Sequence, residues 1–523
     1  MHMYYVIGSG LSGVMCAKAL LAKGKQVTIL DVGITPSKEI LRNKEELALT
    51  NQNEWDKSSF GGVSGTLAQT KGKVPSRLYF NSDYMYADTE KAGIVQEGTN
   101  CRMSYAQGGL AQVWGAAVLP LSAAEFTEWP FGIERMAPHY EAVAREIGIT
   151  GVHDDLEHFF PYYGEPNQGG SISEEANAIE NRLKNYSSRL PRAGIYFGRS
   201  RLAYRARGTG NDTGCRTCGL CLSGCPFNII YSATDTLRDL KKNKNFSYQD
   251  NVKVTRLEEK VSVIIFAQKE GKDVTFEASR VFVACGPLGT LRLISSSLPD
   301  TDNGFLLRYQ PYFMLPMLSF RNFRNVSKEK MHTMAQLFIE LSDKTISAHP
   351  VHMQLYTYSP QIQGEVNRMF GKIPFLKKLA DRFLTGRLLL IQGYLHASDA
   401  PVIRVAVRGG KLALSAPKEQ QVQRIIKKVA RRLFRIAFVF GAVPLLPMLK
   451  FGQPGDGNHA GASFPMKKMP RENETDTYGR LLGWKNVHIV DSSVLSNIPA
   501  PTISYTVMAN AHRIGSESAE LDI

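Results

Sequence analysis

A cysteine-rich segment has the residue types and the spacing to bind iron. Four of the seven cysteines follow the pattern C-x2-C-x2-C-x3-C-P; they are Cys215, Cys218, Cys221 and Cys225. Closely spaced thiolates in a glycine-rich loop can bind several irons, whereas tetrahedral zinc usually takes two pairs of ligands separated by a longer insert. The loop 214–228 therefore predicts an iron–sulfur cluster, with structural or reactive thiols and a zinc site as the alternatives.

Three glycines near the N-terminus have the spacing of a dinucleotide-binding turn, G-x-G-x-x-G. They are Gly8, Gly10 and Gly13. The first permits a tight turn, the second lets the backbone approach a pyrophosphate, and the third allows a helix to pack closely on a strand. An apolar β-prone run (4–7) precedes them and a helical pattern (14–22) follows. The next predicted strand (26–30) ends at Asp31, where a carboxylate can accept hydrogen bonds from an adenosine ribose.

Four segments, in this order, resemble the glucose-methanol-choline family of flavin oxidoreductases. They are the opening glycine motif, Gly108-Gly-Leu-Ala-Gln-Val-Trp114-Gly115, Val281-Phe-Val-Ala-Cys-Gly286-Pro-Leu-Gly-Thr, and the segment from Tyr478 to Arg513. The last segment holds a predicted strand that ends in an acid, followed by a predicted helix over 502–513. The resemblance implies FAD as the cofactor.

The resemblance also implies an α/β fold with two lobes, which suits a chain of 523 residues. One lobe would be a discontinuous, Rossmann-like FAD-binding domain, made of residues 1–125, 201–305 and 452–523. The other would be a substrate domain with a large antiparallel sheet, made of residues 126–200 and 306–451.

The same resemblance implies a set of cofactor contacts. It places Gly8, Gly10, Gly13 and Asp31 on the ADP half of FAD, Gly108, Gly109 and Trp114 beside the flavin, Val254 near the adenine, and Asp491 and Ser492 near the pyrophosphate or the ribityl chain.

In this family, a histidine in a glycine-rich loop takes the proton of the substrate hydroxyl, and the segment 457–461 resembles that loop around His459. A histidine suits the task because its ordinary pKa lies near neutral pH; its alternative is a packing role in the loop. Alignment of the final helix puts Thr502 where the family usually has Asn or His. A threonine cannot act as a base, and its alternative role is a helix N-cap, so Asn458 or Asn497 would compensate.

Some bacterial members of the family carry a three-cysteine 3Fe–4S cluster near the flavin, with the spacing C-x5-C-x3-C. Cys215, Cys221 and Cys225 match it. A 4Fe–4S cluster is the other expectation, although ferredoxins use the fourth cysteine of such a run for a second cluster, and no second run occurs here. A cluster could pass electrons singly to a quinone or a cytochrome, which favours a dehydrogenase.

The chain carries 63 Lys and Arg against 48 Asp and Glu, a formal net charge of +15, so its surface should attract anions. Basic residues alternate with apolar ones in helical patterns over 424–436 and 372–391. These patterns predict either peripheral contact with a membrane or a solvated helix face over the core. We expect no nucleic-acid partner.

Together these features predict an FAD-dependent dehydrogenase that oxidises a CH–OH group of a sugar, amino sugar, polyol or lipid-linked glycan. One alternative is a cluster-free alcohol oxidase that uses O2. Another is an electron-transfer flavoprotein subunit at the membrane without substrate chemistry of its own. The expected location is the cytoplasm, with the inner membrane surface as the site of any peripheral contact.

Overall fold

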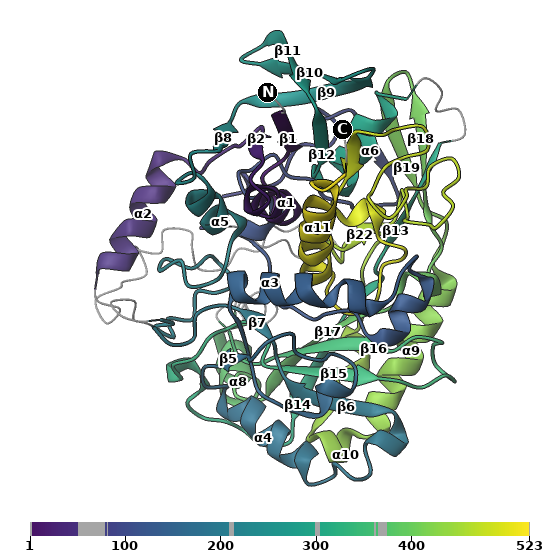
Figure 1. Ribbon diagram of the computed structural model, residues 1–523. Helices are drawn as coiled ribbons and strands as arrows, with labels where there is room; N and C mark the ends of the chain where they lie inside the picture. Colours follow the sequence, from purple (N-terminus) through teal and green to yellow (C-terminus); the bar gives the residue numbers. More distant parts are fainter. Residues whose placement is uncertain are drawn as a thin grey trace.

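A computed structural model describes residues 3–50, 79–80, 82–208, 214–298, 304–359, 362–363 and 374–521. Figure 1 shows a parallel sheet and its helices at one end of the molecule and a large antiparallel sheet at the other. The α/β class and the large antiparallel sheet that the family resemblance implied are therefore confirmed.

Five parallel strands form the first sheet in the order β23-β12-β1-β2-β8. Their bounds are Met3–Ile7 (β1), Gln26–Leu30 (β2), Phe246–Gln249 (β8), Arg280–Val283 (β12) and Val487–Ile489 (β23). The helices that accompany this sheet include α1 (Leu11–Ala22), α5 (Ala233–Leu240), α6 (Gly286–Ser295) and α11 (Ser504–Ser518). The sequence predicted β1 and β2 to within one residue, and it predicted the end of α1 but placed its start three residues late, at 14 instead of Leu11.

A seven-stranded antiparallel sheet dominates the other end. Its strands are β6 (Ile195–Arg199), β14 (Tyr312–Ser319), β15 (Leu337–Leu341), β16 (Val351–Tyr356), β17 (Leu388–Tyr394), β20 (Ala442–Pro444) and β21 (Lys450–Phe451). Helices α4 (Glu174–Lys184) and α9 (Gln420–Arg435) share one apolar core with it, as does Phe440 of the short α10 (Ala437–Phe440). Further helices are α2 (Lys38–Leu49), α3 (Ala137–Ile147) and α8 (Pro374–Phe383).

A third, mixed sheet joins the two ends in the order β22-β13-β18-β19-β3. Its strands are β3 (Ile94–Glu97), β13 (Phe305–Tyr309), β18 (Ile403–Arg408), β19 (Lys411–Ser415) and β22 (Ala460–Gly461). β3 pairs in parallel with β19 across a boundary of the two predicted domains, so those domains share this sheet. Two smaller sheets contain β9 (Val252–Glu259), β10 (Val263–Lys269) and β11 (Lys272–Ala278), and β4 (Ile149–Gly151), β5 (Asn167–Gln168) and β7 (Leu202–Ala203).

The basic pattern over 424–436 forms helix α9. Its apolar residues, Val422, Ile425, Ile426, Val429 and Leu433, are buried in the core beneath the antiparallel sheet. This apolar face of the helix therefore packs on the protein, and the basic residues and Phe434 are presented to the outside. The second basic pattern, over 372–391, lies partly outside the described residues.

This packing predicts unequal effects of two matched substitutions on α9. Val429→Ser should lower the free energy of unfolding by about 2–4 kcal/mol, because it removes fully buried methyl groups and introduces a hydroxyl without a partner. Arg431→Ser, on the exposed face two residues later, should stay within about 0.5 kcal/mol of the parent. Denaturant unfolding of the two variants measures the difference, and equal destabilisation would contradict this packing.

Candidate active site

The main cavity lies at the carboxyl ends of β1, β2 and β12, where open parallel sheets usually bind their ligands. Its lining combines residues from distant parts of the chain: Gly8, Gly10, Asp31, Gly108, Gly109, Val254, Asp491, Ser492, Asn458 and His459. The structure thus brings together ten of the residues that the sequence suggested for cofactor binding or catalysis. Lys253 and Arg292 also line the cavity and add positive charge.

Helices α1 and α6 both begin at this cavity. A methyl group added at Gly10 or at Gly286, at the starts of these two helices, would meet no atom within 4 Å, so the space in front of both is open. The first N–H groups of a helix have no partner within the helix, and the helix dipole adds partial positive charge there. Two such ends in one cavity suit a pyrophosphate.

Gly13 fits a packing role and not a ligand contact. A methyl group at this position would lie 2.0 Å from the carbonyl oxygen of Gly8, which leaves room only for hydrogen. Gly13 is absent from the cavity lining and holds α1 against the turn that precedes it.

A chain of hydrogen bonds connects Asp31 to the second glycine loop. The backbone N–H of Gly108 donates to Ser9 Oγ (2.9 Å), and Ser9 Oγ donates to Asp31 Oδ2. The hydroxyl of Tyr248 donates to the same oxygen (3.1 Å). Burial nevertheless raises the pKa of Asp31 to about 6, because these hydrogen bonds compensate only part of the cost of a buried charge.

The loop at Gly108 and Gly109 has a left-handed backbone, with φ of 81° and 61°. Glycine accepts this conformation without strain and lets the loop come close to the dinucleotide-binding turn at Gly10. A short 3-10 helix spans Gly109–Gln112, and Trp114 follows two residues after its end. Trp114 lines a neighbouring cavity, where its indole N–H donates to the carbonyl of Tyr231 (2.8 Å). The main cavity does not include Trp114 in its lining.

His459 is held by a residue that the sequence did not reveal. Its Nδ1 lies 2.6 Å from Oε1 of Gln310, and its carbonyl accepts from the backbone N–H of Gln310 (2.9 Å). The side-chain amide of Gln310 donates to the carbonyls of Pro499 (2.8 Å) and Pro501 (3.1 Å), so its oxygen must face the imidazole. Nδ1 therefore carries the proton of the neutral ring, and Nε2 keeps a lone pair.

The protonation state of His459 suits a base. Burial of the ring, with a smaller contribution from the nearby His352, lowers its pKa to about 4. The ring is consequently neutral at physiological pH. Asn458, the preceding residue, lines the same cavity and has a left-handed backbone with φ of 58°, which asparagine tolerates.

Asp491 and Ser492 follow the end of β23 and make hydrogen bonds that fix this part of the chain. Asp491 accepts from Thr290 Oγ1 and from the backbone N–H of Ser493, and burial raises its pKa. Ser492 Oγ donates to the carbonyl of Ala460, next to His459 (2.8 Å). These contacts fix the end of β23 beside the histidine loop.

Thr502 lies outside the lining of the main cavity. Its hydroxyl oxygen is buried and has no hydrogen-bond partner among the described residues. Helix α11 begins at Ser504 with Ile503 in the N-cap position, so Thr502 does not cap it either. Ile503 and Ser504 reach the cavity in its place.

The four cysteines of the predicted cluster converge. Cys215, Cys218, Cys221 and Cys225 line one small cavity, whose other walls include Tyr204, Phe227, Ile229 and Met334. Burial raises the pKa of Cys221 to about 12 and raises the pKa of Cys215 and of Cys218. Backbone N–H groups of Thr217 and Ile229 donate to the sulfurs of Cys215 and Cys225, at 3.4 Å each.

No three of these sulfurs form a group within 4.8 Å of one another in the described part of the chain. Two thiolates bound to one zinc at about 2.3 Å cannot be more than about 4.6 Å apart. In the described part of the chain, the group of three His, Cys, Asp or Glu side chains with ligand atoms all within 4.8 Å is Glu125, His349 and His396, and it contains no cysteine. A cluster spreads its thiolates more widely, because each sulfur binds a different iron.

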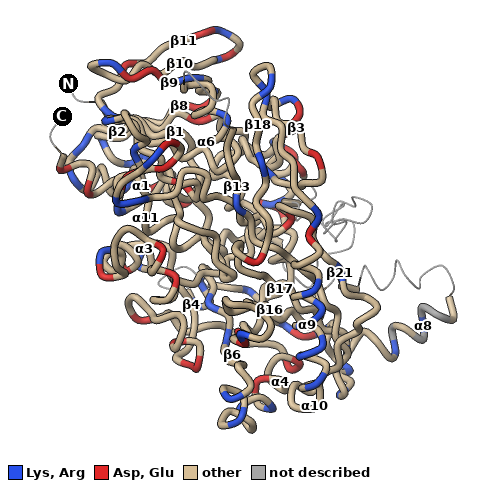
Figure 2. Tube along the Cα trace, turned by 90° about the vertical axis from the view of Figure 1, so that its right-hand side faces the viewer, with Lys and Arg blue, Asp and Glu red and all other residues tan. Residues whose placement is uncertain are grey.

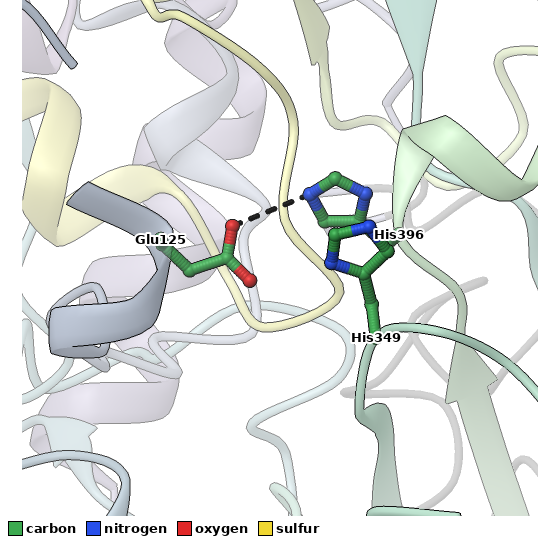
Figure 3. Close-up of side chains that lie close together, drawn as sticks. All are labelled: Glu125, His349 and His396. Atoms are coloured by element: carbon green, nitrogen blue, oxygen red, sulfur yellow. Dashed lines mark ion pairs between the residues drawn. The ribbon is translucent and has the colours of Figure 1, made fainter. Parts of the chain in front are cut away.

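The group of Glu125, His349 and His396 has the donor types of a metal site. The hydrogen bond at the second ring nitrogen of His396, however, does not suit a metal ligand. Figure 3 shows the two imidazoles stacked beside the carboxylate, with ring centroids 3.7 Å apart. Nδ1 of His396 accepts from the backbone N–H of Ser398 (3.1 Å), so the proton of the neutral ring sits on Nε2, which faces Glu125 at 3.3 Å. A metal-bound imidazole needs the opposite arrangement, with its second nitrogen as a donor. This group is best described as a histidine–carboxylate pair.

The cysteine cavity and the main cavity are linked through a third one. Ala111 lines both the main cavity and the cavity that contains Trp114. Cys221 and Cys225 line both that Trp114 cavity and the cysteine cavity. The cysteines therefore lie one cavity away from the glycine loop of the candidate flavin site.

Neither a family model nor a curated protein matches the sequence. Among solved structures, the crystal structure of pyridoxine 4-oxidase from Mesorbium loti matches with a TM-score of 0.62 and 13% sequence identity, over 100% of this chain and 100% of that chain. That protein is a glucose-methanol-choline oxidoreductase. The two chains thus share a fold, and it is the fold that the resemblance of the four sequence motifs implied.

The raised pKa of Asp31 predicts how FAD affinity depends on pH. Protonation below pH 6 removes a carboxylate acceptor for the ribose, so the dissociation constant should rise about tenfold per pH unit below that value. Asp31→Asn should bind FAD weakly at every pH and lose this dependence. Flavin fluorescence titration measures both.

Asp154 is the matched control, since burial also raises its pKa to about 6 and it does not line the main cavity. Asp154→Asn should keep the parent's pH dependence. The same dependence in Asp31→Asn would show that another group titrates.

Proposed function

We propose that this protein is an FAD-dependent oxidoreductase that oxidises a CH–OH group, with His459 as the base. The observation that carries the proposal is the contact between Gln310 and His459, because it presents an unprotonated Nε2 in the same cavity as the dinucleotide-binding turn. A base beside a flavin site is the arrangement that alcohol oxidation requires.

The residues of the main cavity fit FAD. Gly8, Gly10 and the start of α1 would hold the pyrophosphate, Asp31 the adenosine ribose, and Val254 the adenine. The loop at Gly108 and Gly109 would lie against the flavin. Bound FAD would supply an acceptor for a hydride from the substrate carbon.

The protein's own part in the reaction concerns the proton and the water. Nε2 of His459 accepts the proton of the substrate hydroxyl, so that the carbon can release its hydride and become a carbonyl. Gln310 keeps the proton of the free ring on Nδ1 and fixes the plane of the imidazole. Desolvation keeps the ring neutral before substrate binds, which prevents a protonated, inactive base.

The substrate class we propose is a sugar, amino sugar, polyol or lipid-linked glycan. Tyr394 lies beside the base, with its ring centroid 6.1 Å from that of His459, and packs on Tyr312 at 5.1 Å. Both rings are buried and neither lines the main cavity, so the proposed substrate class rests on the family resemblance.

We propose that Cys215, Cys218, Cys221 and Cys225 hold an iron–sulfur cluster of the 3Fe–4S or 4Fe–4S type. Desolvation raises the pKa of Cys215, Cys218 and Cys221, and bound iron would offset the cost of ionising these thiols. Two of the four cysteines also line the cavity that borders the flavin loop, so the cluster would provide a path for single electrons to a quinone or a cytochrome.

The fold likeness to a pyridoxine 4-oxidase favours one other function, an oxidase that passes electrons to O2 without a cluster. Hydrogen peroxide formed in proportion to turnover would establish that alternative. An electron-transfer subunit without substrate chemistry is the third candidate, and flavin reduction by an alcohol under anaerobic conditions would exclude it.

The absorbance spectrum of the purified protein, followed by anaerobic titration with candidate sugars and polyols, tests the proposal. We expect flavin bands that bleach with at least one alcohol. A protein that stays colourless when it is incubated with FAD would refute the proposed function.

We expect substitution of Gln310 to lower kcat and to leave substrate binding nearly unchanged. Gln310→Leu should lower kcat by about 10- to 100-fold with a smaller change in KM, because the imidazole loses its fixed tautomer and orientation. His459→Asn should lower kcat by about 10²- to 10⁴-fold.

Gln336 is the matched control, because it is equally buried, bonds between backbone segments and does not line the main cavity. Gln336→Leu should lose stability but keep kcat. If both glutamine variants lose kcat equally, the role of Gln310 is general folding and not positioning of the base.

Substitution of a cluster cysteine should remove the iron but leave the flavin bound. Cys225→Ser should lose iron and acid-labile sulfide and reduce dyes slowly, but it should keep bound FAD and flavin reduction by substrate, since Cys225 does not line the main cavity. Cys16 is a fully buried cysteine in α1, and the control variant Cys16→Ala should contain as much iron as the parent protein. Parent protein purified without oxygen that contains flavin but only background iron would rule out the cluster.

A further inference from the structure

The positive charge of the chain is concentrated on one segment. Residues 420–455 contain seven Lys and Arg and no Asp or Glu, and the formal net charge of the whole chain is +15. The segment covers α9, α10, β20 and β21. Figure 2 shows the basic residues of α9 on the side of the molecule that faces the viewer, and α8 projects to the right of that side.

The exposed stripe of α9 and α10 changes from basic to aromatic along its length. Lys427, Arg431, Phe434, Arg435 and Phe438 follow at helical spacing, and all five are exposed. Phe434 and Phe438 keep 52% and 69% of their surfaces accessible. No carboxylate of the described residues pairs with Arg431 or Arg435, whereas Arg432, on the flank of the stripe, pairs with Asp343.

Two other exposed phenylalanines are connected to this stripe through hydrogen-bonded neighbours, Phe320 at the end of α10 and Phe383 through the segment that follows Phe320. Phe320 is 51% exposed, and its backbone N–H donates to the carbonyl of Gly441, just after α10 (3.0 Å). Phe383 is 46% exposed at the end of α8, next to Arg382, whose carbonyl accepts from Asn322 (3.4 Å). Every phenylalanine that is exposed in the described part of the chain is in α8, α9 or α10 or is Phe320.

We propose that this surface, defined by Phe320, Phe383, Phe434, Phe438, Arg431 and Arg435 and called here the Phe-Arg surface, binds an anionic lipid bilayer. Arginines without acidic partners attract lipid headgroups, and phenylalanines among them insert below the headgroup level. A nucleic acid would use the charge but leave the phenylalanines in water. A second copy of the chain would bring the same positive charge and be repelled.

The proposed contact differs from the one that the sequence pattern of α9 suggested. The apolar face of α9 is buried in the protein, so the helix cannot place that face in a membrane. Contact instead uses the outward stripe and the neighbouring segment at Phe320. Among the described helices, none is both long and apolar enough to cross a bilayer, so the contact is with one face of it.

Sedimentation of the FAD-loaded full chain with vesicles tests the proposal. Vesicles of phosphatidylcholine with phosphatidylglycerol should bind the protein, and vesicles of phosphatidylcholine alone should bind it much less. Arg431→Gln with Arg435→Gln should weaken binding about 25-fold, at about fivefold for each basic residue. Phe434→Ser with Phe438→Ser should weaken it at least tenfold.

The matched control pair is Val261→Ser with Lys272→Gln in the β9–β11 sheet, at the opposite end of the molecule in Figure 1. It should bind like the parent, and circular dichroism and bound flavin should be unchanged in every variant. Equal binding by all variants, or no binding to anionic vesicles, overturns the proposal. Binding that depends on the arginines alone also overturns it, since that result would indicate a polyanion site.

Discussion

The structure depends on one very close approach, between the opening helix and the turn before it. A methyl group at position 13 would collide with the carbonyl of Gly8, and one at position 8 would lie 2.6 Å from the carbonyl of Ala284. These contacts bring α1, β1 and the end of β12 together without intervening side chains. Because the start of α6 follows β12 directly, the same approach directs two helix N-termini at one cavity.

The cavity combines a region that suits negative charge with one that excludes it. Helix N-termini, Lys253 and Arg292 favour a diphosphate, whereas desolvation keeps His459 neutral and raises the pKa of Asp31. The hydrogen-bond chain from Gly108 through Ser9 to Asp31 lies at the end of the cavity that contains Gly10. A ligand that spans the cavity would therefore meet backbone donors around Gly10 at one end and the neutral imidazole of His459 at the other.

Local patterns in the sequence were sufficient for the dinucleotide-binding unit, because its glycines, strands and acid all lie within one short stretch of chain. The cysteines were also found, since their spacing is local. Gln310 was not, because it meets His459 across 149 residues and its own segment resembles any apolar strand. Thr502 was assigned a catalytic role by alignment alone. The pattern of α9 could not show whether its apolar face contacts the protein core or a membrane, because either contact removes the same residues from water.

The position of the cysteines gives a physical reason to expect two kinds of electron transfer in one chain. Hydride transfer needs contact between reacting atoms, so the base and the flavin loop must share a cavity, as His459 and Gly109 do. Transfer of single electrons needs only proximity, and the cavities that share Ala111, Cys221 and Cys225 place the cysteines near the candidate flavin loop. The convergence of four cysteines on one cavity, two of which also line the neighbouring Trp114 cavity, is the observation on which the iron–sulfur hypothesis rests.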